Sequence, residues 1–170
     1  MERRRKISRV ELGKMLKTRR GKDAEMLVQL RFSTLGIDSR RCPENMKYKD
    51  MDVWDPKNGV KVPVQVKSSS LKKHGAAIRV DAEPLKVFEG WYVILIEQEP
   101  EDIYLYVPSG EMKKLMGEYG EDDKEYGKVR HHKGRRYIDV CPNWGVLQRF
   151  SDPEEFIKTV HEAGRPQGRD

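Results

Sequence analysis

The sequence has little of what marks a secreted, membrane-spanning or disulfide-linked protein. Its only two cysteines, Cys42 and Cys141, lie far apart and lack the paired spacing of a zinc site. No apolar run is long enough to span a membrane, and Met1 is followed by charged residues instead of the apolar core of a secretory signal. We therefore expect an intracellular, cytoplasmic protein with reduced thiols and no membrane partner.

Several common catalytic signatures are also missing. The sequence has no Gly-rich phosphate-binding loop, no dinucleotide-binding fingerprint and no nucleophile elbow. His131 and His132 are adjacent, and adjacent side chains on an extended segment point to opposite faces, so joint metal ligation is not expected. These absences argue against the commonest nucleotide-binding, serine-hydrolase and zinc-binding classes.

Positive charge is abundant and unevenly distributed. The 170-residue chain has a formal net charge of +6 and a pI near 9.2, which favours a polyanionic partner such as DNA. Basic residues gather in residues 1–22 and again in residues 128–136. A disordered tail or a localisation signal explains the first cluster equally well, and a solvated loop explains the second equally well. The candidate DNA-contacting residues are Arg3, Arg4, Arg5, Lys6, Arg9, Arg19, Arg20, Lys22, Ser69, Lys128, Arg130, Lys133, Arg135 and Arg136.

The side chains that suggest chemistry lie on a predicted β-hairpin. Residues 62–69 alternate valines on one face of a strand with Gln65, Lys67 and Ser69 on the other. Residues 51–55 form the predicted partner strand, and Asn58-Gly59 is the strongest two-residue turn signal in the chain. The hairpin would bring Asp52 beside the amide and the lysine.

This set of groups suits a divalent cation and a phosphate. A carboxylate and an amide oxygen are hard ligands for a magnesium ion, and a nearby ammonium can orient water or stabilise a pentavalent phosphate. The alternative is that Gln65, Lys67 and Ser69 are the solvated face of a half-buried strand.

An amphipathic helix is predicted upstream of the hairpin. Apolar residues recur at helical spacing from Ala24 to Leu35, and Gly36 is a plausible stop. Glu25 lies near the start, where the helix dipole favours an acid. It could also face the hairpin and supply the negative charge that Gln65 lacks, and both readings stay open.

The order of Ala24-Glu25, Asp52, a hairpin and Gln65-Val66-Lys67 resembles the PD-(D/E)xK nuclease superfamily over about residues 19–110. Small resolvase-like or Mrr-like members are the most similar, and some of them carry a glutamine in the motif. The resemblance implies the α/β (α+β mixed sheet) restriction-endonuclease-like fold, with a central mixed sheet flanked by helices. It also implies that Asp52 and Gln65 bind Mg²⁺ or Mn²⁺, that Lys67 assists the water or the phosphate, and that Glu25 completes the site.

Two positions depart from the superfamily pattern. Met51 stands where a proline is usual, and Asp50 offers a competing register on the same strand face. Asp52 is preferred because Val53 and Trp54 follow it as a core-building pair, and it lies 13 positions before Gln65. The second departure is Gln65 itself. Its neutral amide should bind metal less tightly than a glutamate, so catalysis would be slow, dependent on Glu25, or absent.

The resulting hypothesis is a divalent-metal-dependent endodeoxyribonuclease that hydrolyses phosphodiester bonds with metal-activated water. The alternative is a non-catalytic DNA-binding or assembly protein on a nuclease fold. A DNA-reading N-terminal helix is a third idea, but residues 9–18 form only one capped helix, too little for a helix-turn-helix. Cleavage of both strands by so small a domain favours a homodimer or higher homo-oligomer. The fold does not indicate which DNA is the substrate.

We divide the chain into a basic arm with a short helix at residues 1–18, a nuclease-like domain at 19–163 and a flexible tail at 164–170. A long mobile loop is expected at 117–134, and Ser151 is expected to cap a last helix that ends near His161. The other expected elements are strands at 76–80, 91–96, 103–107 and 136–140, a turn or short helix at 84–89, and a helix at 110–116 that Ser109 caps.

Overall fold

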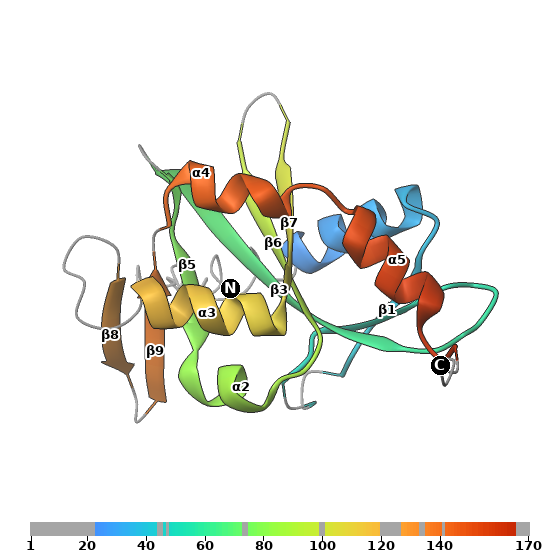
Figure 1. The fold of residues 1–170 in the computed structure, drawn as a ribbon, viewed down its shortest axis with the longest axis horizontal. Helices are drawn as coiled ribbons and strands as arrows, with labels where there is room; N and C mark the ends of the chain where they lie inside the picture. Colours follow the sequence, from blue (N-terminus) through green and yellow to red (C-terminus); the bar gives the residue numbers. More distant parts are fainter. Residues whose placement is uncertain are drawn as a thin grey trace, which may run out of the picture.

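The fold is a central mixed β-sheet with helices on both faces and a smaller sheet beside it (Figure 1). The computed structural model describes residues 23–43, 46, 48–72, 75–98, 101–119, 127–132, 135–140 and 142–165, beginning with a helix over 23–34. The strands are β1 (Asp38–Arg41), β2 (Met51–Trp54), β3 (Val62–Lys72), β4 (Gly75–Ala76), β5 (Ile78–Asp81), β6 (Trp91–Glu97), β7 (Ile103–Pro108), β8 (Gly127–His132) and β9 (Arg135–Val140). The other helices are α2 (Ala82–Val87), α3 (Ser109–Tyr119), α4 (Trp144–Leu147), the 3-10 helix η1 (Gln148–Phe150) and α5 (Glu154–Glu162).

The central sheet combines parallel and antiparallel pairing. Its strands lie in the order β1-β2-β3-β6-β7, and β4 pairs with β3. β3 and β6 run parallel, whereas β1 with β2, β2 with β3, and β6 with β7 are antiparallel. The predicted α/β (α+β mixed sheet) fold, with a central mixed sheet flanked by helices, is therefore confirmed.

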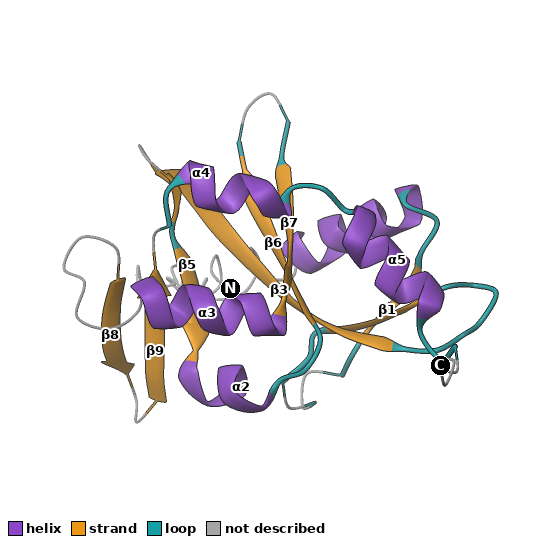
Figure 2. Ribbon diagram, in the orientation of Figure 1, coloured by secondary structure: helices purple, strands orange, loops and turns teal. Residues whose placement is uncertain are grey.

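The two faces of the sheet are covered by different helices (Figure 2). Because side chains alternate across a strand, neighbouring residues of β6 belong to two separate core clusters. Trp91, Val93 and Leu95 pack with the helix over 23–34 and with α5, whereas Tyr92, Ile94 and Ile96 pack with α2, α3 and α4. The continuous apolar run of β6 thus forms the buried central strand that the sequence predicts.

The helix over 23–34 forms where its apolar spacing predicts it. Ala24, Val28 and Phe32 are at most 1% exposed and face the sheet. The helix stops at Gly36, whose φ of +71° is a left-handed conformation that favours glycine. Phe32 stacks on Phe156 of α5 at a centroid distance of 5.4 Å, which joins the two helices of this layer. None of the helices in the described part of the chain is long and apolar enough to cross a membrane.

The start of the last helix differs from the prediction. Ser151 does not cap it, because its hydroxyl donates to the backbone carbonyl of Gln148 at 2.7 Å. Pro153 is the residue before the helix and has no side-chain capping bond, while the Asp152 carboxylate accepts from the N–H of Glu154 at 2.9 Å. The chain is still turning at Ser151 after η1, so the acid one residue later satisfies the first N–H of the helix.

The predicted loop over 117–134 is wrong in two places. α3 continues to Tyr119, and β8 pairs with β9 in an antiparallel hairpin. β5, β9 and β8 together form the second, three-stranded sheet. Backbone pairing with β5 stabilises this hairpin, although residues 117–134 contain few apolar side chains. β1, α4 and η1 are further elements that the sequence did not predict.

Candidate functional site

The predicted hairpin is present, and its register decides which side chains meet. β2 runs antiparallel to β3, with Met51 opposite Val64 and Asp52 opposite Pro63. In the connecting turn, Gly59 has a φ of +67°, which explains why a glycine is found there. The predicted pairing of the two strands is confirmed, but residues 55–61 connect them, so Asn58-Gly59 belongs to a longer turn and not to a two-residue one.

Asp50, one residue before β2, lies across from Gln65. Its N–H donates to the carbonyl of Val64 at 2.9 Å, and its Oδ2 accepts from the N–H of Val66 at 2.8 Å. One backbone bond and one side-chain bond thus attach Asp50 to β3 beyond the last strand pair, Met51 with Val64. Asp50 is thus bonded to the residues on both sides of Gln65, whereas Asp52 lies opposite Pro63. The prediction that the hairpin places Asp52 beside Gln65 and Lys67 is therefore wrong.

Asp52 is buried and belongs to an internal ion pair. Both of its carboxylate oxygens accept from Nζ of Lys49, at 2.8 and 2.9 Å. The thiol of Cys42 donates to Oδ2 at 3.8 Å, and burial together with the Asp52 charge raises the pKa of Cys42. The negative charge of Asp52 is thus already neutralised by a side chain of the same protein.

Gln65 is also buried, at 5% exposed, and its amide is in use. Nε2 donates to the backbone carbonyl of Tyr48 at 2.6 Å. Oε1 is the end of the amide that this bond leaves for another partner. Gln65 therefore ties the segment before β2 to the middle of β3.

Lys67 and Ser69 share the strand face of Gln65. Lys67 lies opposite Ile94 in the parallel β3–β6 pair and is half-buried. The hydroxyl of Ser69 donates to the backbone carbonyl of Ala77, so this candidate DNA contact has a partner inside the protein.

Tyr92 adds a buried hydroxyl beside these residues. It lies opposite Gln65 in the β3–β6 register and is fully buried. Within the described chain, its oxygen is a buried polar atom without a hydrogen-bond partner. Burial, and then the charge of Asp50, raise the pKa of Tyr92, so the hydroxyl stays protonated at neutral pH.

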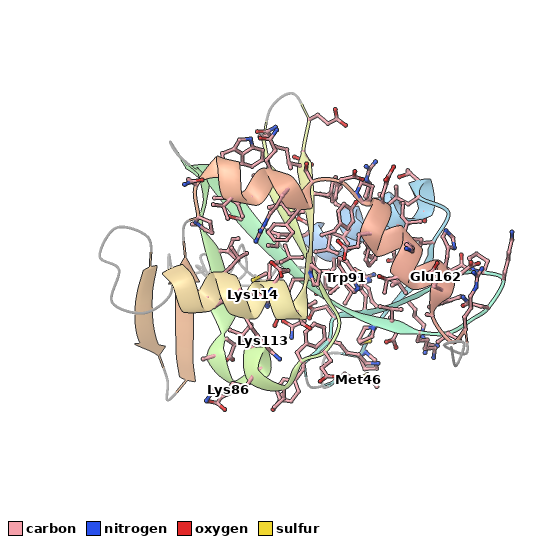
Figure 3. The ribbon with its side chains drawn as sticks, in the orientation of Figure 1. Met46, Lys86, Trp91, Lys113, Lys114 and Glu162 are labelled. Carbon is pink, nitrogen blue, oxygen red and sulfur yellow. The ribbon has the colours of Figure 1, made fainter. Side chains whose placement is uncertain are left out.

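A cavity of about 240 Å³ lies between the helix over 23–34 and the segment that precedes β2. It is lined by Glu25, Arg41, Cys42, Pro43, Met46, Lys49 and Asp50. Figure 3 shows Met46 at the lower edge of the molecule. Two carboxylates and two cations thus share one cavity, and Glu25 is one of the carboxylates.

The donor chemistry of this cavity fits a hard divalent cation. Carboxylate oxygens such as those of Glu25 and Asp50 are the ligands that Mg²⁺ prefers, and the ion usually keeps several waters. No group of three or more His, Cys, Asp and Glu side chains in the described residues is placed to hold a metal. A metal bound here would therefore complete its coordination with water and phosphate oxygens.

The basic residues predicted to contact DNA are described only in part. Residues 1–22, with the expected short helix at 9–18, and Lys133 lie outside the described residues. Lys128 and Arg130 belong to β8, and Arg135 and Arg136 belong to β9. The second basic cluster is therefore a β-hairpin and not the end of a loop.

Sequence reasoning missed the parts played by Tyr48 and Lys49. Neither residue lies in a periodic element, so hydrophobic patterning gives no signal for them. The spacing of Lys49 and Asp52, three residues apart across a turn, is the one local hint of their ion pair.

No family model and no curated protein matches this chain. Among solved structures, it resembles Hjc, a Holliday junction resolvase from Archaeoglobus fulgidus, at 9% identity and a TM-score of 0.42, over 76% of this chain and 96% of that one. It also resembles the bacterial homing endonuclease I-Ssp6803I at 16% identity and a TM-score of 0.42, over 80% of this chain and 94% of that one. Likeness at this level says nothing about what this chain binds or catalyses.

Proposed function

We propose that this protein is a divalent-metal-dependent endodeoxyribonuclease that hydrolyses phosphodiester bonds in DNA. The proposal is supported chiefly by the cavity that Glu25 and Asp50 share, next to the strand that carries Gln65 and Lys67. The net charge of +6 favours a polyanionic substrate. Cleavage of both strands by so small a domain would require a homodimer or higher oligomer.

Each residue has a role that its chemistry allows. Glu25 and Asp50 would hold Mg²⁺ or Mn²⁺, which when bound polarises a phosphate and makes a coordinated water more acidic. Lys67, two residues past Gln65 on the same face, would orient the attacking water or stabilise charge on the phosphate. Asp52 would position Lys49 at the cavity. The alternative ligand pair, Asp52 and Gln65, requires Lys49 to leave the Asp52 carboxylate.

A nicking assay tests the enzymatic proposal. Purified protein would be incubated with Mg²⁺ or Mn²⁺ and with plasmid, four-way-junction and single-stranded DNA. We expect Lys67→Ala to lower the cleavage rate by about 100-fold or more, because a charge-stabilising group is lost. The matched control is Lys86→Ala, which removes an exposed lysine that pairs with Glu83 at 3.1 Å. The proposal fails if wild type cleaves none of the substrates and Lys67→Ala equals wild type in every assay.

A second function is supported by a separate observation. The Asp52 carboxylate and the Gln65 amide are both held by partners inside the protein, as in a DNA-binding or assembly protein that no longer catalyses. That function predicts salt-dependent DNA binding without any divalent ion. Binding would then be lost by neutralising the arginines between Arg3 and Arg9, and would be unchanged by Asp50→Asn.

A further inference from the structure

Tyr48 has a backbone conformation that tyrosine rarely adopts. Its φ is +73°, in the left-handed region, and no other non-glycine residue in the described part of the chain has a positive φ. Such a conformation strains a residue with a Cβ atom, and it persists only where the surroundings hold it.

A hydrogen bond from Gln65 holds the backbone of Tyr48 in this conformation. Its Nε2 donates to the Tyr48 carbonyl at 2.6 Å, and the Gln65 side chain is buried within the central sheet. Two residues after Tyr48, Asp50 is fixed by its bonds to Val64 and Val66. The turn formed by Tyr48, Lys49 and Asp50 is therefore attached to β3 by the residues on both sides of Lys49.

This bond explains why residue 65 is an amide. A carbonyl oxygen needs a donor, and a glutamate carboxylate has none when ionised. A glutamate at position 65 would place a buried negative charge against the Tyr48 oxygen, which is unfavourable. The glutamine supplies the N–H that the turn requires, whether or not its oxygen meets a metal.

Two large side chains of the segment before β2 are exposed at the surface. Tyr48 is 39% exposed and Met46 is 49% exposed, although both are large apolar side chains. Met46 lines the cavity together with the cations Arg41 and Lys49. Tyr48 does not line the cavity itself, but it directly precedes Lys49, which does. Proteins bind single-stranded nucleic acid with exposed aromatic rings of this kind, since any base can stack on the ring.

We propose that Tyr48 determines specificity by stacking on an unpaired nucleobase of the DNA, and that Gln65 positions it. The bases of an intact duplex stack on each other, so the ring selects DNA with unpaired bases close to the scissile phosphate. This inference rests on the proposed function in requiring DNA as the ligand. It goes beyond that function in naming the class of DNA.

A binding experiment without metal separates this inference from catalysis. Fluorescence anisotropy in EDTA would compare a single-stranded oligonucleotide with a blunt duplex of equal length. Tyr48→Gly removes the ring and suits the positive φ, so the variant keeps its fold. We expect it to weaken binding of the single strand by about 10-fold and to leave duplex binding unchanged. Tyr48→Phe should bind as wild type does, and Val87→Ala, at an exposed apolar residue of α2, is the control.

A spectroscopic readout tests the positioning role of Gln65. A 2-aminopurine placed in the single strand loses fluorescence when it stacks on an aromatic ring. We expect this quenching with wild type and Tyr48→Phe, and its loss with Tyr48→Gly. Gln65→Glu should also lose it, although the ring is still present, because the turn is no longer held. Circular dichroism would establish that each variant is folded.

The inference is overturned if Tyr48→Gly binds the single strand as tightly as wild type does. It is also overturned if both DNA forms lose affinity equally, since the ring would then be a general contact. Nicking assays in parallel keep the two proposals apart. Cleavage by wild type with no effect of Tyr48→Gly on binding refutes the stacking role alone, whereas selective binding without any cleavage refutes the nuclease alone.

Discussion

Asp50 and Asp52 lie on one strand face, two residues apart, but they have different partners. Asp52 gives both oxygens to Lys49 inside the protein. Asp50 accepts one backbone N–H, from Val66, and lines the cavity with Glu25. The sequence could not separate them, because both fit the strand pattern and the apolar pair after Asp52 favours the latter. The two aspartates differ because Lys49, in the loop before β2, pairs with Asp52. Loop conformation has no periodic signature in the sequence.

Asp52 should therefore matter for stability. We expect Asp52→Asn to lower the free energy of unfolding by about 1–2 kcal/mol, because Lys49 loses one of its two hydrogen bonds and the opposite charge in a mostly buried setting. Urea denaturation at neutral pH would measure the change. Glu83→Gln is the control, since Glu83 belongs to an exposed pair that contributes little. Equal unfolding midpoints for Asp52→Asn and wild type would contradict this role.

The left-handed backbone of Tyr48 gives a second stability prediction. Glycine adopts a φ of +73° without steric cost, whereas alanine does not. Tyr48→Gly should consequently be more stable than Tyr48→Ala by about 1 kcal/mol, measured by the same denaturation. At an ordinary residue the order is reversed, so an alanine variant more stable than the glycine variant would show that the turn is not strained.

At the scale of elements, the turn between β2 and β3 is attached to α5. The Oδ2 atom of Asp55 lies 2.6 Å from Nδ1 of His161, and its Oδ1 accepts from the N–H of Lys57 at 2.7 Å. The Asn58 amide donates to the His161 carbonyl at 3.1 Å. Asp55 is therefore the point where the hairpin and the last helix meet.

This attachment makes stability depend on acidic pH. The Lys57 N–H, and then the bond with His161, lower the pKa of Asp55 below its ordinary value of 3.8. A carboxyl with a lowered folded pKa contributes stability above its unfolded pKa and loses that contribution as the pH falls through the folded value. Asp55→Asn should thus lose less stability than wild type below about pH 4, in urea denaturation across an acidic pH series. Parallel pH profiles for the two proteins would refute the role of Asp55.

The elements that the sequence predicts are those with apolar periodicity. The helix over 23–34, β3, β6 and β7 each cover a core cluster, so their patterns are strong. β1 reads Asp-Ser-Arg-Arg and is mostly exposed at the sheet edge, which leaves no alternation to detect. β8 and β9 exist because their backbones pair with each other and with β5, a long-range event that a local pattern does not record.

At the scale of the whole molecule, the sequence predicts which elements lie around the cavity but not all of the residues that line it. Glu25 and the hairpin were found because each lies in a regular element with a clear pattern. Tyr48 and Lys49 were not found, since their contacts are made across a turn. The cavity thus combines predictable elements with an unpredictable loop.

The uneven charge of the chain predicts how DNA binding responds to salt. Each phosphate contact by an arginine or lysine steepens the dependence of log K on log salt by about 0.9. Replacing Arg3, Arg4, Arg5 and Arg9 with glutamine should reduce that slope by about 3 to 4, measured by anisotropy over a salt series. Lys86→Gln, at an exposed lysine of α2, is the single-site control. An unchanged slope would mean that the basic arm does not contact DNA.

The most direct test of the account is Mn²⁺ binding, followed by the electron paramagnetic resonance signal of the free ion. Asp50→Asn keeps an oxygen that can accept from Val66, so it removes the charge and not the fold. We predict that wild type binds Mn²⁺, that Glu25→Gln and Asp50→Asn weaken binding by about 10-fold or more, and that Asp52→Asn binds nearly as wild type does. Loss of binding in Asp52→Asn with full binding in Asp50→Asn, or no binding by wild type, would contradict the assignment of Glu25 and Asp50 as the metal site.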